Sequence, residues 1–241
     1  MTRDDPQDPE MDSSELESTP VEIGPTRRNY DLVASVYRPL AQVYSLGAIE
    51  RSKRAQLEFI NKGDCVLYMG AGQGDDVVAA ARHGADVHAI DLSSNMLARL
   101  QAQLTRKNVS AVLICGDAIN HEVDEPYDAV CLNYFLNMFP APVMGQFLDK
   151  AIGLVKPGGL IMIADMAPPS GNVITRNLKQ GYLKLGPLFY KMLGLMGNTR
   201  IWDHPASLEE RGCTQIEIRD APMAGLGAVL FRAVIARTPV L

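Results

Sequence analysis

Residues 66–76 read Val-Leu-Tyr-Met-Gly-Ala-Gly-Gln-Gly-Asp-Asp, and this stretch decides the fold. An apolar run, a Gly-x-Gly-x-Gly turn and a helical pattern predict a buried strand, a tight turn and a helix. Glycines there let the backbone bend sharply and approach a ligand with no Cβ in between. Asp91 follows 21 residues after Gly70, at the end of the next apolar run. A carboxylate at that place can accept hydrogen bonds from both ribose hydroxyls, so the pair predicts a site for a nucleoside-containing cofactor.

The position of the third glycine separates two kinds of cofactor. Dinucleotide sites favour Gly-x-Gly-x-x-Gly, whose last glycine packs the helix closely below a pyrophosphate, whereas Gly74 comes one residue earlier. The helix also opens with Asp75 and Asp76, whose charges repel a pyrophosphate where a helix N-terminus would otherwise favour one. A ligand with a sulfonium and an amino group but no phosphate meets no such repulsion. The loop therefore indicates S-adenosylmethionine rather than NAD or FAD.

Alternation of short apolar runs with longer helical patterns predicts a Rossmann-like, doubly wound α/β sheet of seven strands. The runs 64–69, 85–90, 111–115, 129–132 and 159–165 are expected to be parallel strands buried on both faces, and the runs 214–219 and 228–236 a terminal antiparallel hairpin. Helices are expected near residues 75–83, 94–107 and 142–155. Lys156-Pro157-Gly158-Gly159 is expected to close the last of them and turn the chain into the next strand.

Three segments lie outside this alternation. Residues 1–25 hold eight acids against one base, with three prolines, and are predicted to be a disordered acidic leader. Residues 26–241 are expected to form one domain. Within it, residues 28–60 are expected to be helical, and residues 172–204 to be an apolar helical insertion. Both can lie as a lid over the carboxyl ends of the strands, where open α/β sheets bind ligands.

Charge and cysteine usage exclude several classes of function. The net charge is −5, and without the leader the remaining chain is nearly neutral, which disfavours nucleic-acid binding. The start of the chain has neither the apolar core of a signal peptide nor the arginines of a transit peptide, so we expect a cytoplasmic protein. Cys65, Cys115, Cys131 and Cys213 form no C-x-x-C pair. Buried reduced thiols are expected, and no metal site.

The ordered motifs of this chain resemble those of class I S-adenosylmethionine-dependent methyltransferases. The resemblance rests on the loop 70–74, on Asp91 with the following 92–96, on the turn 116–118 and on 154–159. It implies that the glycine loop holds the methionine part, Asp91 the ribose and Asp117 the adenine amino group, with apolar walls from Met96 and Ala118. The full set of cofactor residues that we infer is Tyr30, Tyr37, Gly70, Ala71, Gly72, Gly74, Asp91, Leu92, Met96, Gly116, Asp117, Ala118 and Asn133.

Within that class, the chain is most similar to the quinone C-methyltransferases of menaquinone and ubiquinone biosynthesis. Tyr30-Asp31-x-x-Ala34-x-x-Tyr37 resembles the opening motif of that group, in which an aromatic residue helps to close the cofactor site. Two positions depart from the pattern. Tyr68 stands where family members usually have an acid that anchors the amino group of the cofactor. Arg38 stands where the quinone enzymes tend to have Asp.

Candidate catalytic residues follow the fourth predicted strand and end the insertion. Asn133 and Asn137 are placed to orient a substrate oxygen, although helix capping is an equal interpretation. His204, beside the single Trp202, is the best candidate for a general base, with a structural loop histidine as the alternative. A base is required only if the methyl acceptor is protonated, as in a phenol or an aromatic C–H.

The apolar stretch 181–197 is too broken by Gly, Pro and Lys to span a bilayer. It can lie on a membrane surface, line an apolar substrate pocket or form a buried cap. The sequence thus predicts a methyltransferase that acts on a small, hydrophobic, quinone-like acceptor. An N- or O-methyltransferase of a lipid or natural product is the first alternative. A methyltransferase-like module that binds the cofactor without catalysis is the second.

Overall fold

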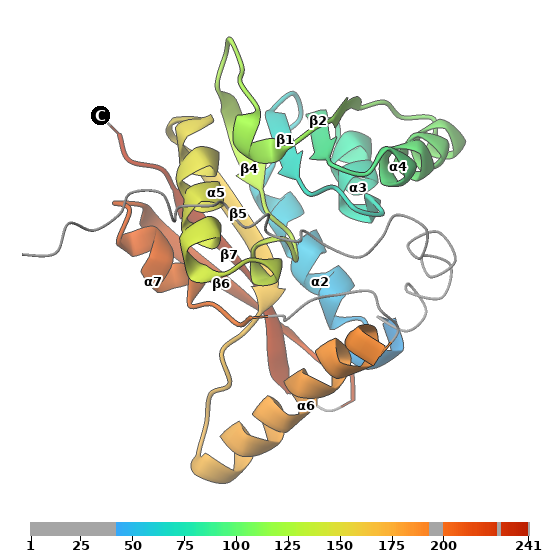
Figure 1. The fold of residues 1–241 in the computed structure, drawn as a ribbon. Coiled ribbons are helices and arrows are strands. Elements are labelled where there is room, and N and C mark those ends of the chain that lie inside the picture. Colours follow the sequence, from blue (N-terminus) through green and yellow to red (C-terminus); the bar gives the residue numbers. More distant parts are fainter. Residues whose placement is uncertain (1–41, 193–199, 226–227, 241) are drawn as a thin grey trace, which may run out of the picture.

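The fold was determined from a computed structural model, which describes residues 42–192, 200–225 and 228–240. A single seven-stranded sheet runs through the molecule in the order β3-β2-β1-β4-β5-β7-β6 (Figure 1). Strands β1 to β5 are parallel, and β7 runs antiparallel to both β5 and β6. The expected doubly wound sheet with a terminal antiparallel hairpin is confirmed. The predicted acidic leader, residues 1–25, lies outside the described residues. Positions 28–41 of the predicted helical segment 28–60 lie outside them as well.

Strand and helix bounds follow the apolar runs closely. The strands are β1 (Cys65–Met69), β2 (Asp86–Asp91), β3 (Val112–Cys115), β4 (Tyr127–Cys131), β5 (Val155–Met166), β6 (Thr214–Pro222) and β7 (Val229–Arg237). The α-helices are α2 (Ala48–Ala55), α3 (Asp75–His83), α4 (Ser94–Lys107), α5 (Ala141–Gly153), α6 (Val173–Met192) and α7 (His204–Glu209). The described residues also form three short 3-10 helices, η1 (Gln56–Phe59), η2 (Ala118–Asn120) and η3 (Leu136–Met138).

Helices cover both faces of the sheet, because the parallel strands are apolar on both sides. On one face, α5 and α7 contribute buried residues such as Phe147 and Leu208 to a core with Leu67 and Ile163. On the other face, α3 and α4 pack Val77, Leu100 and Leu104 over Val66 and Ala129. Alternate residues of one strand therefore enter different cores, which fixes the register of the central strands.

The boundary between α5 and β5 differs from the prediction. The helix ends at Gly153, and Lys156-Pro157-Gly158-Gly159 belongs to the first part of β5 rather than to a turn before it. The pairing with β4 shifts there, from Tyr127 opposite Val155 to Ala129 opposite Leu160. Proline and glycine are accommodated in this strand because the irregularity frees the backbone from regular pairing.

The prediction of strands buried on both faces is wrong for β3. This strand is at the edge of the sheet, and Val112 and Cys115 at its two ends are exposed. The prediction of uniformly buried thiols is wrong for the same reason: all four cysteines are free, Cys131 and Cys213 are buried, but Cys115 is exposed. An edge strand shares fewer neighbours than a central one, so an apolar run alone does not report its burial.

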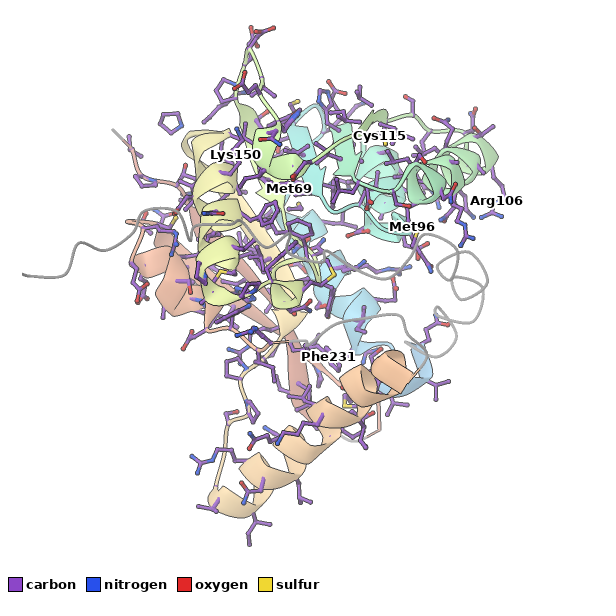
Figure 2. All side chains as sticks on the ribbon, viewed as in Figure 1. Met69, Met96, Arg106, Cys115, Lys150 and Phe231 are labelled. Atoms are coloured by element: carbon purple, nitrogen blue, oxygen red, sulfur yellow. The ribbon has the colours of Figure 1, made fainter. Side chains whose placement is uncertain are left out.

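The two helical segments outside the alternation meet at the carboxyl end of β5. Ala48 of α2 and Leu183 of α6 share a small buried cluster with Met166, the last residue of β5, and with Phe231 of β7. Figure 2 shows the side chain of Phe231 close to both helices. Both segments thus contact the carboxyl end of β5, and the idea that they form a lid stays a prediction. From this contact α6 extends away from the body of the molecule (Figure 1).

Candidate active site

A crevice for a ligand is expected between β1 and β4, because neighbouring connections leave the sheet in opposite directions there. In the order β3-β2-β1-β4-β5, the chain after β1 goes toward β2 and the chain after β4 goes toward β5. The loop 70–74 follows β1, and the run 132–139 follows β4. The two stretches that the sequence singled out therefore lie at the same edge of the sheet.

The three loop glycines all have left-handed backbone angles, with φ of +72° at Gly70, +53° at Gly72 and +70° at Gly74. A Cβ on Gly70 would lie 2.3 Å from the ring of Phe135, and one on Gly74 would lie 2.4 Å from Leu100. A Cβ on Gly72 would meet only a backbone oxygen, at 4.0 Å. Packing thus explains Gly70 and Gly74, whereas the open space over Gly72 is the part of the loop that suits a ligand.

Asp91 ties this loop to the start of α4. Its Oδ2 accepts a hydrogen bond from the backbone N–H of Gly72 at 2.9 Å, and its Oδ1 accepts one from Ser93 at 2.8 Å. Each carboxylate oxygen can accept a further hydrogen bond. The carboxylate is therefore already oriented by the backbone, and its remaining lone pairs suit the two hydroxyls of a ribose.

The neighbouring residues provide a surface of the right chemistry for an adenine ring. Ala118 is buried, Met96 is partly exposed and Leu92 is 60% exposed. A Cβ on Gly116 would meet no atom within 4 Å. Asp117 caps the 3-10 turn η2 by accepting from the N–H of Ile119 at 3.1 Å, which leaves its second oxygen for an amino group.

These residues fit an S-adenosyl group. They combine the open space over Gly72 with the carboxylate of Asp91, and none of them has a basic side chain that would bind a phosphate. Among the inferred cofactor residues, the loop 70–74, Asp91 and the turn 116–118 are brought to one edge of the sheet by β1, β2 and β3. Tyr30 and Tyr37 lie outside the described residues.

The side chain of Asn133 has another role than the expected one. Its Nδ2 donates to Gln56 Oε1 at 3.0 Å and to Asp76 Oδ2 at 2.8 Å, and its Oδ1 accepts from Gln56 Nε2 and from the N–H of Ala164. An asparagine amide has two donor hydrogens and two acceptor lone pairs, so all four positions are used. The amide links η1, α3 and β5 to the end of β4, and only the backbone of Asn133 is left for a ligand.

Tyr68 stands where members of the family usually have an acid, and the carboxylate of Asp76 lies near it. Tyr68 is buried beneath the loop, and burial, together with Cys131 and Asp76, raises the pKa of its hydroxyl well above the ordinary value. The carboxylate of Asp76 is also buried, and its Oδ1 has no hydrogen-bond partner among the described residues. Lys53 Nζ lies 3.5 Å from that oxygen. The acid missing at position 68 is therefore matched by a carboxylate that enters from the first turn of α3.

A buried polar cluster joins three segments that are far apart in the sequence. Asp165, the penultimate residue of β5, accepts from Asn137 Nδ2 at 2.8 Å and from His204 Nε2 at 3.0 Å. The exposed fractions are 2% for Asp165 and His204 and 3% for Asn137. The N–H of Met166 also donates to Asp165. The structure thus brings both predicted catalytic residues onto one carboxylate, which sequence reasoning missed.

The cluster leaves two polar atoms free. Neither Asn137 Oδ1 nor His204 Nδ1 has a hydrogen-bond partner within the described ranges. Because a carboxylate only accepts, His204 Nε2 must carry the proton, and Nδ1 must hold the lone pair when the ring is neutral. Buried polar atoms are nearly always paired, and both of these atoms accept hydrogen bonds, so together they indicate a site for a donor such as a hydroxyl.

Two aromatic residues lie near this cluster along the chain. Tyr134, three residues after β4, has a φ of +52°, which a bulky residue rarely adopts. Its N–H donates to the carbonyl of Ala164, next to Asp165, and its hydroxyl lies 2.8 Å from the hydroxyl of Ser52. Trp202 donates from Nε1 to the carbonyl of Leu136 at 3.2 Å, next to Asn137. The segment that carries His204 is thereby attached to the end of β4.

A second group of potential ligands lies at the other end of the sheet. Cys65 at the start of β1 and Asp86 and His88 of β2 place their ligand atoms within 4.8 Å of one another. The hydroxyl of Tyr127 contacts His88 Nδ1 and His121 Nε2, both at 3.0 Å. The spacing of these residues in the sequence gives no signal for the cluster, since it depends on strand pairing.

Comparison with known proteins agrees with this geometry. A family described as a methyltransferase domain matches residues 66–159, which run from β1 into β5. A solved structure of 1,6-didemethyltoxoflavin-N1-methyltransferase from Burkholderia thailandensis, with bound 1,6-didemethyltoxoflavin and S-adenosylhomocysteine, has the same fold. Its TM-score is 0.62 at 16% identity, covering 88% of this chain and 87% of that one. The chain belongs to the class I S-adenosylmethionine-dependent methyltransferases.

The curated relatives narrow the comparison. A demethylmenaquinone methyltransferase of Paenarthrobacter aurescens (strain TC1) is 30% identical over 176 residues, which are 72% of this chain and 66% of that protein. The demethylmenaquinone methyltransferase of Beutenbergia cavernae is 29% identical over 143 residues, which are 58% of this chain and 57% of that protein. The chain thus matches less than two thirds of the length of either relative. The expected likeness to the quinone methyltransferases is confirmed.

Proposed function

We propose that this protein methylates a hydrophobic, quinone-like aromatic ring with S-adenosylmethionine. The single observation that carries the proposal is the buried cluster of Asn137, Asp165 and His204 at the carboxyl ends of β4 and β5. The similarity to demethylmenaquinone methyltransferases supports a ring of this kind. We place the enzyme in the cytoplasm, acting on a small molecule rather than on nucleic acid.

The cofactor supplies an activated methyl group on a sulfonium, so the protein has mainly to position the acceptor and manage its proton. Gly72, Asp91 and Asp117 would hold the S-adenosyl group. Asp76 would receive the amino group that the usual acid at position 68 binds in relatives, because its buried Oδ1 accepts no hydrogen bond within the described residues and only Lys53 Nζ, at 3.5 Å, forms an ion pair with it.

His204 is assigned as the general base. Its Nδ1 would take the proton of a ring hydroxyl, so that electron density moves into the ring and a ring carbon forms the new bond to the methyl carbon. The bond from the methyl carbon to the sulfonium sulfur would break at the same time, with S-adenosylhomocysteine as the leaving group. The methylated ring carbon would then lose its hydrogen as a proton, which restores the aromatic ring. Asp165 would stabilise the resulting imidazolium through the 3.0 Å contact with Nε2. Asn137 would hold Asp165 in orientation through Nδ2 and offer its free Oδ1 to the acceptor.

Turnover of a short-tailed demethylmenaquinol by His204→Ala tests this function. We expect a fall of about 10²–10⁴-fold, with binding of S-adenosylhomocysteine unchanged by calorimetry. His83→Ala serves as the matched control, because His83 is an exposed histidine at the end of α3.

Unchanged turnover in His204→Ala would remove His204 as the general base from the mechanism. Turnover of phenols or amines but not of quinols would indicate the alternative O- or N-methyltransferase. Cofactor binding without turnover on any acceptor would indicate a non-catalytic module.

A further inference from the structure

Helix α6 has a composition unlike the rest of the chain. Its 20 residues contain four bases and no acid, whereas the whole chain has a net charge of −5. None of the helices in the described ranges is long and apolar enough to cross a membrane. A basic helix with a strong apolar face that is too polar to span a bilayer is typical of one that lies along its surface.

One face of α6 anchors the helix to the site. Leu183 is buried in the cluster with Met166, which directly follows Asp165. The ring of Tyr182 stacks on that of Tyr44, with centroids 5.2 Å apart and planes 11° from parallel, and its hydroxyl bonds the carbonyl of Tyr44. The helix is therefore held next to the carboxyl end of β5 by its second half.

The opposite face is apolar and exposed. Ile174, Leu178 and Leu185 are 72%, 69% and 57% exposed, and their spacing of four and seven residues places them on one side of the helix. Val173 at the first position is exposed as well. Large apolar side chains gathered on one exposed stripe indicate a surface that is covered in use. Arg176 and Lys184 are exposed on the same helix.

We propose that α6 lies on an anionic lipid bilayer, with Ile174, Leu178 and Leu185 in the acyl region and Lys184, on the flank of that stripe, near the lipid phosphates. The charge of the helix favours this occupant, because acidic headgroups attract a segment with bases only. The inference rests on the proposed function in one respect: a hydrophobic acceptor resides in the same bilayer. Leu183 and Met166 then connect the membrane surface with the cluster around Asp165.

Vesicle flotation tests the docking surface. We expect the full-length protein to float with vesicles of phosphatidylcholine and phosphatidylglycerol, and less with phosphatidylcholine alone. Ile174→Gln with Leu178→Gln should weaken binding by about tenfold or more, because both side chains lose favourable burial. Lys184→Gln should weaken it by about fivefold on anionic vesicles only. Arg176→Gln should weaken it less, because Arg176 is on the side of the helix opposite to the apolar stripe. Ile218→Gln is the control, an exposed apolar residue on β6 that should change nothing.

Several outcomes would overturn this proposal. Absence of flotation for the unaltered protein is the first, and equal flotation of the Ile174/Leu178 variant is the second. Self-association that the same variant abolishes, without vesicle binding, would assign the stripe to a second copy of the chain instead. Turnover of a short-tailed, water-soluble quinol is measured in parallel. If it persists while flotation fails, the docking surface is wrong and the proposed function stands; if turnover fails while flotation persists, the reverse holds.

Discussion

The two halves of the sheet encode their sites differently. In the half built from β1, β2 and β3, ligand-binding groups come from short motifs directly after a strand, and they are oriented by the backbone, as Asp91 is by Gly72 and Ser93. In the half built from β4, β5 and α7, the buried polar cluster joins side chains that are 28 and 39 residues from Asp165. In our proposal, local sequence motifs thus bind a cofactor that is common to many enzymes, and tertiary contacts build the site for the acceptor.

The largest effect is expected from Asp165→Asn in the second half. The new amide can turn its NH₂ group toward His204 Nε2, which then must accept and leaves the proton on Nδ1. Because the imidazole loses its lone pair at the atom that we assign as the base, turnover should fall by about 10²–10⁴-fold. Calorimetry with S-adenosylhomocysteine should show unchanged affinity. A parallel loss of affinity would mean that the two halves are not separable.

In the first half, the free energies of unfolding of two glycine variants can be compared. Gly70→Ala places a methyl group against the ring of Phe135 in a left-handed conformation, and should lower the free energy of unfolding by about 2–4 kcal/mol. Gly72→Ala has the same backbone strain but open space, so about 1–2 kcal/mol is expected. Urea denaturation measures both. Equal losses would show that packing against Phe135 does not explain Gly70.

A binding comparison tests whether Asp76 replaces the absent acid. Asp76→Asn keeps an acceptor for Asn133 but loses the charge, so affinity for S-adenosylhomocysteine should fall by about tenfold. Affinity for 5′-methylthioadenosine, which has no amino-acid part, should not change. Asp75→Asn, one position earlier on α3, is the matched control. If both ligands lose affinity equally, Asp76 has only a structural role.

The smallest effect is expected at the edge of the first half. Cys115 is exposed, whereas Cys131 is buried and burial raises the pKa of its thiol. Alkylation of the folded protein should therefore label Cys115 first and leave the midpoint of thermal unfolding within about 1 °C. Peptide mass mapping identifies the labelled position. Early labelling of Cys131 would show that the central sheet opens readily.

The elements of the first half, built from β1, β2 and β3, could be predicted well from the sequence, and the reason is physical. The left-handed glycines 70, 72 and 74 and the hydrogen bonds that Asp91 accepts from Gly72 and Ser93 belong to two short turns that directly follow β1 and β2, so their spacing carries the information. Sequence reasoning placed α3 and α4 within the same bounds as the structure. It misjudged the burial of Cys115, because an apolar run does not report whether its strand is central or at an edge.

The second half was less predictable because its contacts are long-range. His204 and Asn137 were singled out one at a time, but their common partner Asp165 was missed. A signal existed, since Asp165 is a single acid at the end of the apolar run 160–164. Asn133 lies in an apparently similar run, yet the link to Gln56 and Asp76 depends on η1 and α3 packing beside β4, which no local pattern shows.

The position of β7 between β5 and β6 has a consequence for synthesis of the chain. Until residues 229–237 leave the ribosome, β5 has a free edge and β6 has no partner strand in the sheet. Unpaired edges of this kind invite association between chains. The half of the sheet near β1, β2 and β3 can form early, whereas the surroundings of Asp165 are completed only by the latest strand. A nascent chain should therefore complete the half that we assign to the cofactor before the half that we assign to the acceptor, and its need for chaperones should be greatest between the two steps.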